Sequence, residues 1–154
     1  MTTSPACPCP TCAALAGAAP HPLRAEIPPA LAGILLDVAW SQTALWSIDG
    51  PVRTLPIIEL RWHYELPWWR GPDGRCFEVR PADVLARPGA YPEHDRRLAE
   101  CDLDVPIHVV RRHGRWQILD GIHRVAQADR TGREHVEAVE LDPADLVRIT
   151  RATR

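Results

Sequence analysis

The amino-acid sequence predicts a single α+β domain, in which a small mixed sheet is surrounded by packed helices. Its 154 residues, 45% of them hydrophobic, suffice for one ordinary core. Toward the C-terminus, segments with strand-like alternation are interleaved with segments of helical periodicity. One strand runs directly into a helix through an Asp-Gly pair. We expect three regions: a flexible proline- and cysteine-rich tail over 1–29, a helix and linker over 30–54, and the folded domain over 55–154.

Prolines dominate the N-terminal tail and predict that it packs little. They stand at Pro5, Pro8, Pro10, Pro20, Pro22, Pro28 and Pro29. Within the tail, Cys7, Cys9 and Cys12, with His21 downstream, are weak candidate zinc ligands. Structural zinc sites usually pair two Cys-x-x-Cys knuckles, and only one irregular half is present here. A flexible tail is therefore the favoured interpretation.

Residues 30–48 have the spacing of an amphipathic helix that covers the domain or meets a partner. Leu31, Ile34 and Leu35 recur near helical intervals. The first strand of the domain is expected to begin at about Leu55, after a short linker.

Two adjacent tryptophans, Trp68 and Trp69, lie in a turn-rich loop that leads to a short expected strand over 77–79. An indole face can stack on any nucleobase, which makes Trp68 a candidate accessory residue. Tryptophan is usually buried because of its large area, so at least one of the pair is expected to cover the core.

Two helices are expected next, one from Arg80 and one from Tyr91 to about Cys101. His94 and Arg97 lie on one side of the second helix, where they could reach an anion. The alternative is that they are ordinary surface residues.

The remaining elements follow in close succession. They are a hairpin of 105–110 and 115–119, a helix from 122 to a C-terminal cap at Gly132, a strand over 135–141, and a final helix opened by Asp142 and Pro143.

The junction at residues 120–124 is expected to bind an anion. Unpaired backbone N–H groups at a helix start, with the helix dipole behind them, attract a phosphate. Asp120 either caps the helix or holds Mg²⁺ through a water, and Gly121 lets a ligand approach the backbone. His123 and Arg124 stand in the first turn as side-chain donors. The structural alternative is a histidine bonded within its own turn and an arginine in a surface ion pair.

The run from Asp120 to Arg124, with Ile122 at its centre, resembles the signature of the ParB and sulfiredoxin superfamily. Members of this superfamily hold nucleotide phosphates at a Gly-x-x-Arg or Gly-x-His-Arg turn between a strand and a helix. The resemblance covers about residues 55–141. It implies a ParB/sulfiredoxin-like fold and a nucleotide-binding role for the whole run.

Departures from the family patterns separate its branches. Sulfiredoxins carry their reactive cysteine where this chain has Ile122, so sulfinic acid repair is not expected. ParB proteins carry Glu-Arg in place of Ile122-His123 and continue into DNA-binding and dimerisation domains, whereas this chain ends at Arg154. The free-serine kinases of this fold use Asp-Gly-His-His-Arg, which this chain matches except at Ile122.

The resemblance to the kinases implies an acidic residue soon after the first strand. Glu65 is the candidate general base, with His63 as an accessory residue, although the kinase pattern has no extra residue between them. This carboxylate, with a phosphate held by His123 and Arg124, would support in-line transfer from ATP or ADP with Mg²⁺ to a small hydroxyl-bearing substrate. The alternative for Glu65 is a solvated turn residue.

Composition excludes several classes of function. All 18 basic residues are arginines, which excludes a Walker-type phosphate loop and Schiff-base chemistry. The formal net charge of −2 does not favour nucleic acid. The sequence has no apolar run of membrane-spanning length, no signal peptide and an odd number of cysteines, so a cytoplasmic protein is expected.

The leading functional prediction is a nucleotide-binding protein, most concretely an ATP- or ADP-dependent small-molecule kinase. The alternative is a non-catalytic regulatory module that binds a nucleotide or a protein partner. A protein related to DNA partition is the third choice.

Overall fold

A computed structural model describes residues 9–153 and contains a four-stranded mixed sheet. The strand order is β1-β4-β2-β3. The outer pairs, β1 with β4 and β2 with β3, are antiparallel, while β2 and β4 run parallel in the centre. The strands are β1 (Val52–Pro56), β2 (Ile107–Arg112), β3 (Arg115–Asp120) and β4 (His135–Leu141).

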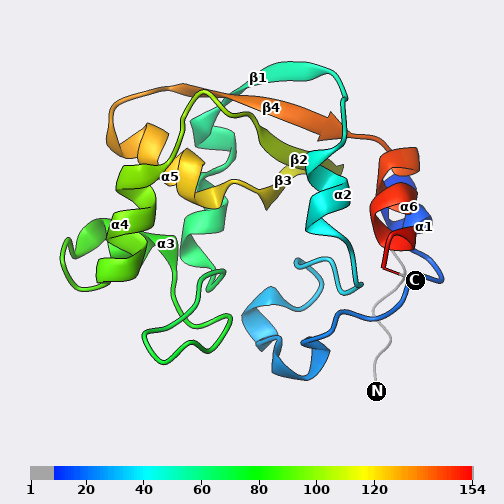
Figure 1. Cartoon of the computed structure of the whole chain (residues 1–154), viewed down its shortest axis with the longest axis horizontal. Helices are drawn as coiled ribbons and strands as arrows, with labels where there is room; N and C mark the ends of the chain where they lie inside the picture. Colours follow the sequence, from blue (N-terminus) through cyan, green and yellow to red (C-terminus); the bar gives the residue numbers. More distant parts are fainter. Residues whose placement is uncertain (1–8, 154) are drawn as a thin grey trace.

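Helices occupy both sides of this sheet (Figure 1). The α-helices are α1 (Pro10–Ala14), α2 (Gln42–Trp46), α3 (Pro81–Ala86), α4 (Pro92–Glu100), α5 (Ile122–Arg130) and α6 (Pro143–Arg151). Short 3-10 helices are η1 (Arg24–Glu26), η2 (Pro29–Leu31), η3 (Ile57–Glu59) and η4 (Arg61–Glu65). None of the helices within residues 9–153 is long and apolar enough to cross a membrane.

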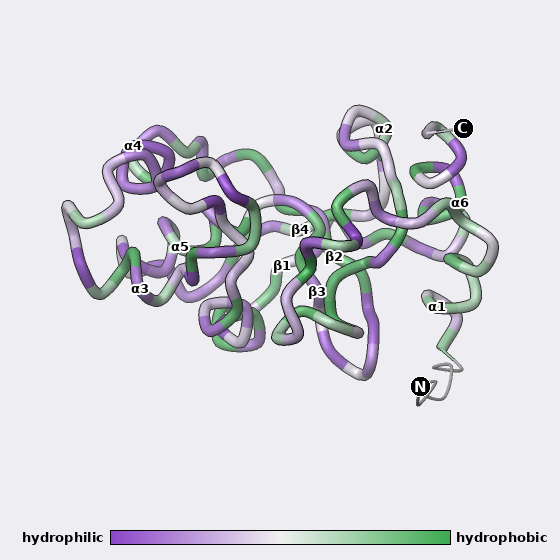
Figure 2. Tube along the Cα trace, turned by 90° about the horizontal axis from the view of Figure 1, so that it is seen from below, coloured by the Kyte–Doolittle hydropathy of each residue, from purple (hydrophilic) through white to green (hydrophobic). Residues whose placement is uncertain are grey.

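The sheet separates two apolar clusters. Ile107 and Val109 of β2 belong to the larger one, which lies under α3, α4 and α5, whereas Val110 belongs to the smaller one under α2 and α6. This division follows from the alternation of side chains along a strand. The strands carry both apolar and polar colouring, as side-chain alternation requires, whereas α4 is mostly polar (Figure 2).

The expected mixed sheet with surrounding helices is confirmed, and several elements lie where the sequence placed them. The hairpin and the strand at 135–141 are formed, as are helices α4, α5 and α6. Asp142 accepts a hydrogen bond from the Asp145 backbone, and the Asp145 side chain bonds the Asp142 N–H in return. This reciprocal capping box fixes the start of α6.

The expected helix over 30–48 is wrong. The segment forms only η2 and the short helix α2, which Ser41 caps through a hydrogen bond from the Ala44 N–H. Between them, Gly33 has φ +74° and Val38 forms a β-bridge with Pro20. The backbone in this part is therefore paired with the preceding segment rather than within a helix.

Residues 9–29 also pack more than their proline content predicts. Thr11 of α1 is buried and donates a hydrogen bond to the Arg111 carbonyl at 2.6 Å. Helix α1 lies against α6 and β2. The short strand expected at 77–79 is reduced to a single bridge between Trp69 and Val79.

Candidate functional site

The turn between β3 and α5 is built on Gly121, which has φ +111°. A Cβ at this position would lie 2.5 Å from Cγ2 of the buried Ile107. Only glycine therefore satisfies both the backbone angle and the space available. The strand can turn into the helix directly against the core.

Gly121 is the N-cap residue of α5, and no side chain caps this helix. The expectation that Asp120 would be the cap is wrong. Its Oδ2 instead accepts hydrogen bonds from Arg124 at 2.8 Å and from the exposed indole of Trp46 at 3.1 Å. Because the helix start lacks a side-chain cap, the N–H groups of its first turn remain available to a ligand.

The Arg124 guanidinium is engaged by the protein itself. Besides Asp120, it donates to the carbonyls of Pro106 at 3.0 Å and Val105 at 3.4 Å. Its side chain is only 16% exposed. Arg124 therefore ties the start of α5 to the segment before β2, through an ion pair that is largely buried and not at the surface as the structural alternative had it.

His123 belongs to a stacked aromatic cluster. Trp69 lies against His123 with 3.9 Å between ring centres and against His94 with 4.9 Å. His123 Nε2 is 3.1 Å from His94 Nδ1, and His94 Nε2 is 2.7 Å from the Arg70 carbonyl oxygen. Because a carbonyl only accepts, His94 carries its proton on Nε2. In the uncharged pair, His123 then donates through Nε2 and has Nδ1 left as an acceptor.

Burial, together with the neighbouring Arg97 and His94, lowers the pKa of His123 to about 3. His123 is therefore neutral at physiological pH. It contributes shape and an acceptor to the site, and positive charge must come from other residues.

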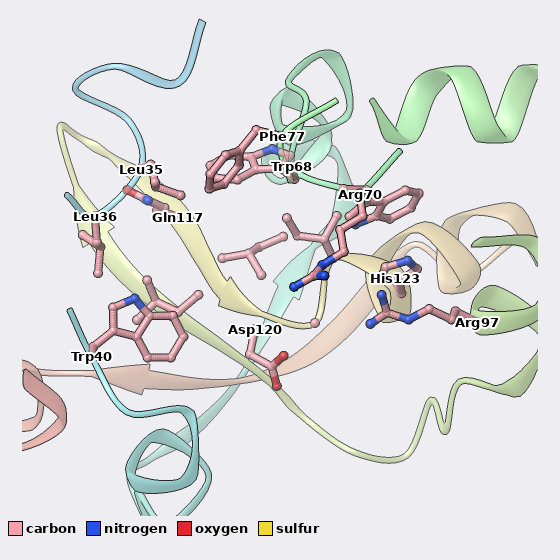
Figure 3. Close-up of a pocket in the computed structure, with 15 residues that line it drawn as sticks. Leu35, Leu36, Trp40, Trp68, Arg70, Phe77, Arg97, Gln117, Asp120 and His123 are labelled. Carbon is pink, nitrogen blue, oxygen red and sulfur yellow. The ribbon is translucent and has the colours of Figure 1, made fainter. Parts of the chain in front are cut away.

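Two arginines supply that charge. Arg70 and Arg97 line a pocket of about 270 Å³ together with Gly121 and His123. Their guanidinium groups point toward the space beside His123 (Figure 3). Both side chains are exposed, and neither makes an ion pair within residues 9–153. The sequence pattern identified Arg97 as able to reach an anion but gave no signal for Arg70, which a loop brings to the site.

The other end of the same pocket is apolar. Trp40, Trp68 and Phe77 line it, with Leu35 and Leu36. Trp68 is held in place because its indole N–H donates to the His63 carbonyl at 2.8 Å. Trp69, by contrast, is 5% exposed and belongs to the core, so one tryptophan of the pair covers the core as expected.

A second pocket of about 300 Å³ adjoins the same turn. It shares Arg97, Asp120, Gly121 and His123 with the first and adds Arg124 and Cys101. The turn therefore borders two pockets, and Arg97 lines both.

The residues expected near the first strand do not join this pocket. Glu65 is 71% exposed and forms an ion pair with Arg80 at 3.4 Å, outside the pocket lining. His63 is fully buried and has both ring nitrogens engaged, because Nδ1 donates to the Leu60 carbonyl and Nε2 accepts the Ile118 N–H. Burial lowers the pKa of His63 to about 4. His63 is therefore a structural residue that holds the outer edge of β3.

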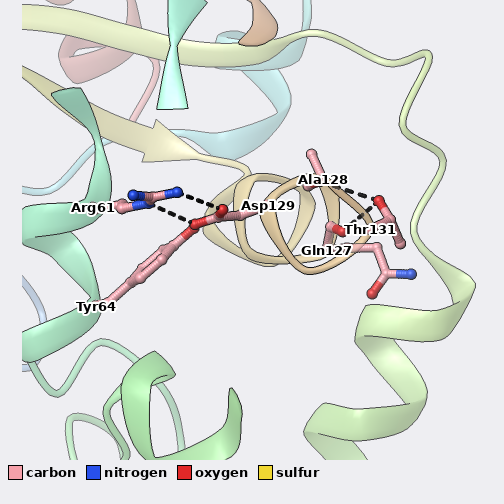
Figure 4. A network of polar contacts seen from close by, with 6 residues as sticks. All are labelled: Arg61, Tyr64, Gln127, Ala128, Asp129 and Thr131. Carbon is pink, nitrogen blue, oxygen red and sulfur yellow. Dashed lines mark hydrogen bonds and ion pairs between the residues drawn. The ribbon is translucent and has the colours of Figure 1, made fainter. Parts of the chain in front are cut away.

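A second polar network fixes the far end of α5 (Figure 4). Asp129 accepts two hydrogen bonds from Arg61, both at 2.9 Å, and one from the Tyr64 hydroxyl at 3.0 Å. Burial and the adjacent Asp129 carboxylate raise the pKa of Tyr64, so its hydroxyl stays protonated. Helix α5 is thereby anchored to η4, and its first turn is held in place.

The candidate zinc ligands do not form a cluster in the described part of the chain. Cys7 lies outside the described residues, and Cys9 Sγ accepts the Cys12 N–H at 3.4 Å as the N-cap of α1. Residues 9–153 contain no group of three or more metal-ligating side chains.

Comparisons with known proteins give two similarities. Over 68 residues, 43% of this chain, it is 44% identical to the transcriptional regulator NovG of Streptomyces niveus; the match spans 21% of that protein's length. Among solved structures, the chain is similar to C-terminally truncated ParB of Caulobacter crescentus complexed with CTP-γ-S, with 23% identity and a TM-score of 0.34. That similarity covers 68% of this chain and 54% of ParB. No family model matches this chain.

Proposed function

We propose that the pocket beside the β3–α5 turn binds a nucleoside phosphate. The main observation is that one cavity contains both polar and apolar binding groups. It is lined by a helix start without a side-chain cap, by two arginines that make no ion pair in the described residues, and by aromatic side chains. Phosphate oxygens would accept hydrogen bonds from the first-turn N–H groups, Arg70 and Arg97. The base would lie against Trp68 and Phe77.

Asp120 is the carboxylate that would meet a magnesium ion carried by such a ligand. It is the single acidic residue lining the first pocket within the described chain, and all its hydrogen bonds are made through Oδ2. One carboxylate oxygen fits Mg²⁺, which usually takes its remaining ligands from water and phosphates. The neighbouring Arg124 offsets the carboxylate charge, which weakens this site.

A regulatory module is favoured over a kinase. A general base must lie within hydrogen-bond reach of its substrate, and Glu65 faces Arg80 instead of the pocket. Asp120 is a weak replacement, because its Oδ2 already accepts hydrogen bonds from Arg124 and Trp46. The stretch shared with a transcriptional regulator supports the same choice. We therefore propose that nucleotide binding changes what this protein contacts rather than what it phosphorylates.

Calorimetric titration with ATP, ADP, CTP and GTP, each with Mg²⁺, tests the binding proposal. We expect at least one nucleotide to bind, and Arg97→Gln to weaken it about tenfold, the usual effect of losing a hydrogen bond to a charged group. Arg96→Gln is the matched control, since Arg96 is the neighbour on the same helix and lies outside the pocket. Equal affinities for the two variants, or no binding by wild type, would overturn the proposal.

The choice between regulator and kinase is tested on the same preparations. Incubation of ATP or ADP with free serine and related hydroxyl compounds should give no phosphorylated product. If product forms and Glu65→Gln abolishes it while nucleotide affinity is retained, the kinase is the correct assignment.

A further inference from the structure

A basic cluster stands apart from the pocket, around the tip of the β2–β3 hairpin. We define this hairpin-tip patch as Arg53, Arg111 and Arg115 with the two tryptophans beneath them, Trp62 and Trp116. The Arg53 and Arg111 guanidinium carbons lie 5.1 Å and 4.9 Å from the centre of the Trp116 ring. The Arg115 guanidinium carbon lies 3.5 Å from the centre of Trp62. The two rings are joined, because the Trp62 indole donates to the Trp116 carbonyl at 3.2 Å.

Stacking holds these guanidinium groups in place while their N–H edges stay exposed. Arg111 and Arg115 make no ion pair within residues 9–153, and Arg53 shares only Glu140 at 3.3 Å. Arg53 and Arg111 are thus both held beside the Trp116 ring, and only Arg53 of the two makes an ion pair in the described residues. The connection between β2 and β3 is coloured as hydrophilic, in agreement with the arginines on either side of it (Figure 2).

We propose that the hairpin-tip patch binds the phosphate backbone of a nucleic acid. The centre of a protein interface is usually apolar, whereas a nucleic-acid interface is polar and strongly positive. Trp116 is 6% exposed, and Arg115 lies over one face of the partly buried Trp62, so the exposed part of the patch is mainly guanidinium. The buried Trp116 ring is not open to stacking with a base. Contact is therefore through phosphates and independent of base sequence.

The net charge of −2 does not oppose this proposal, because it is an average over the whole chain. Binding to a polyanion depends on the local field, and counterions released from the nucleic acid supply the free energy. The patch lies on the sheet edge and hairpin, and it shares no residue with the pocket beside Gly121. If the hairpin-tip patch does not bind nucleic acid, the proposal that the pocket binds a nucleotide is not affected.

The test measures binding of the purified chain to a DNA duplex of about 20 base pairs by fluorescence anisotropy, from 25 to 200 mM salt. We expect a dissociation constant of about 10⁻⁴–10⁻⁶ M or tighter. The Arg111→Gln/Arg115→Gln variant should bind at least tenfold more weakly at 100 mM salt. The negative slope of log K against log salt should become less steep by about 2. Arg96→Gln/Arg148→Gln, which removes the same charge from other surfaces, should match wild type.

A third variant separates charge from packing. Arg111→Lys/Arg115→Lys keeps the positive charge, so it should restore most of the salt-dependent binding even if stacking on the tryptophans is weaker. Thermal unfolding of every variant checks that it is folded. Three results would overturn the proposal: no binding by wild type, equal binding by the patch and control variants, or capture of a poly-glutamate peptide in preference to DNA.

Discussion

Replacing Gly121 by alanine is the sharpest test of how the β3–α5 turn is built. Gly132 provides a matched control, because it also has a positive φ, +89°, but a Cβ there would meet nothing within 4 Å. Alanine at Gly132 should cost about 1 kcal/mol, because the left-handed backbone penalty is partly offset by the lower conformational entropy of the unfolded chain. At Gly121 the same backbone penalty is joined by overlap with Ile107, at 2.5 Å from Cγ2 and 2.9 Å from Cβ.

Overpacking of a buried site costs about 1–3 kcal/mol, so Gly121→Ala should lower the free energy of unfolding by about 2 kcal/mol more than Gly132→Ala does. Urea unfolding with an unchanged m-value measures the difference. Ile107→Ala combined with Gly121→Ala should be less destabilising than the sum of the two single changes by about 1 kcal/mol. Equal losses for the two glycine variants, or strict additivity with Ile107→Ala, would refute the steric account of the turn.

Three further predictions follow from buried or capping groups. The pKa of His63 is about 4 when folded and 6.5 when unfolded, so the unfolded chain binds more protons between these values. The contribution of His63 to the free energy of unfolding should therefore fall by about 3 kcal/mol from pH 6.5 to pH 4, and His63→Asn should remove that part of the pH dependence in urea titrations, leaving the part that His123 contributes. Asp142→Ala removes the reciprocal cap of α6 and should cost about 1 kcal/mol in the same assay, a result contradicted if the midpoint does not move. Asp129→Asn should weaken the anchor of α5 to η4 and lower the melting temperature by several degrees, whereas Glu65→Gln, at an exposed ion pair, should leave it within about 1 °C.

Local patterns in the sequence were sufficient for most of the elements. The hairpin, the helix after Gly121 and the capped helix after Asp142 depend on contacts between residues close in the chain, and each formed as predicted. The segment 30–48 did not, because helical spacing alone cannot reveal that its backbone pairs with Pro20. Long-range pairing overrides local propensity there.

The candidate site shows the same division. The sequence identified the turn at residues 120–124 as a helix start open to an anion, and the structure leaves that helix without a side-chain cap. It could not assign the roles within the turn. Arg124 is engaged by Asp120 and two carbonyls, and His123 is neutral against Trp69. Which side chain is free to meet a ligand depends on partners that are distant in sequence.

The sequence by itself was sufficient to predict that a strand turns into a helix at a glycine, because backbone angles and capping are local properties of a few residues. Only the tertiary structure decided where the charge lies. Arg70 and Arg97 come from a loop and from α4 to stand beside His123, while Glu65 turns to Arg80. Charge and burial at a site depend on the distances between elements, and those distances are set by how the two apolar clusters pack against the sheet.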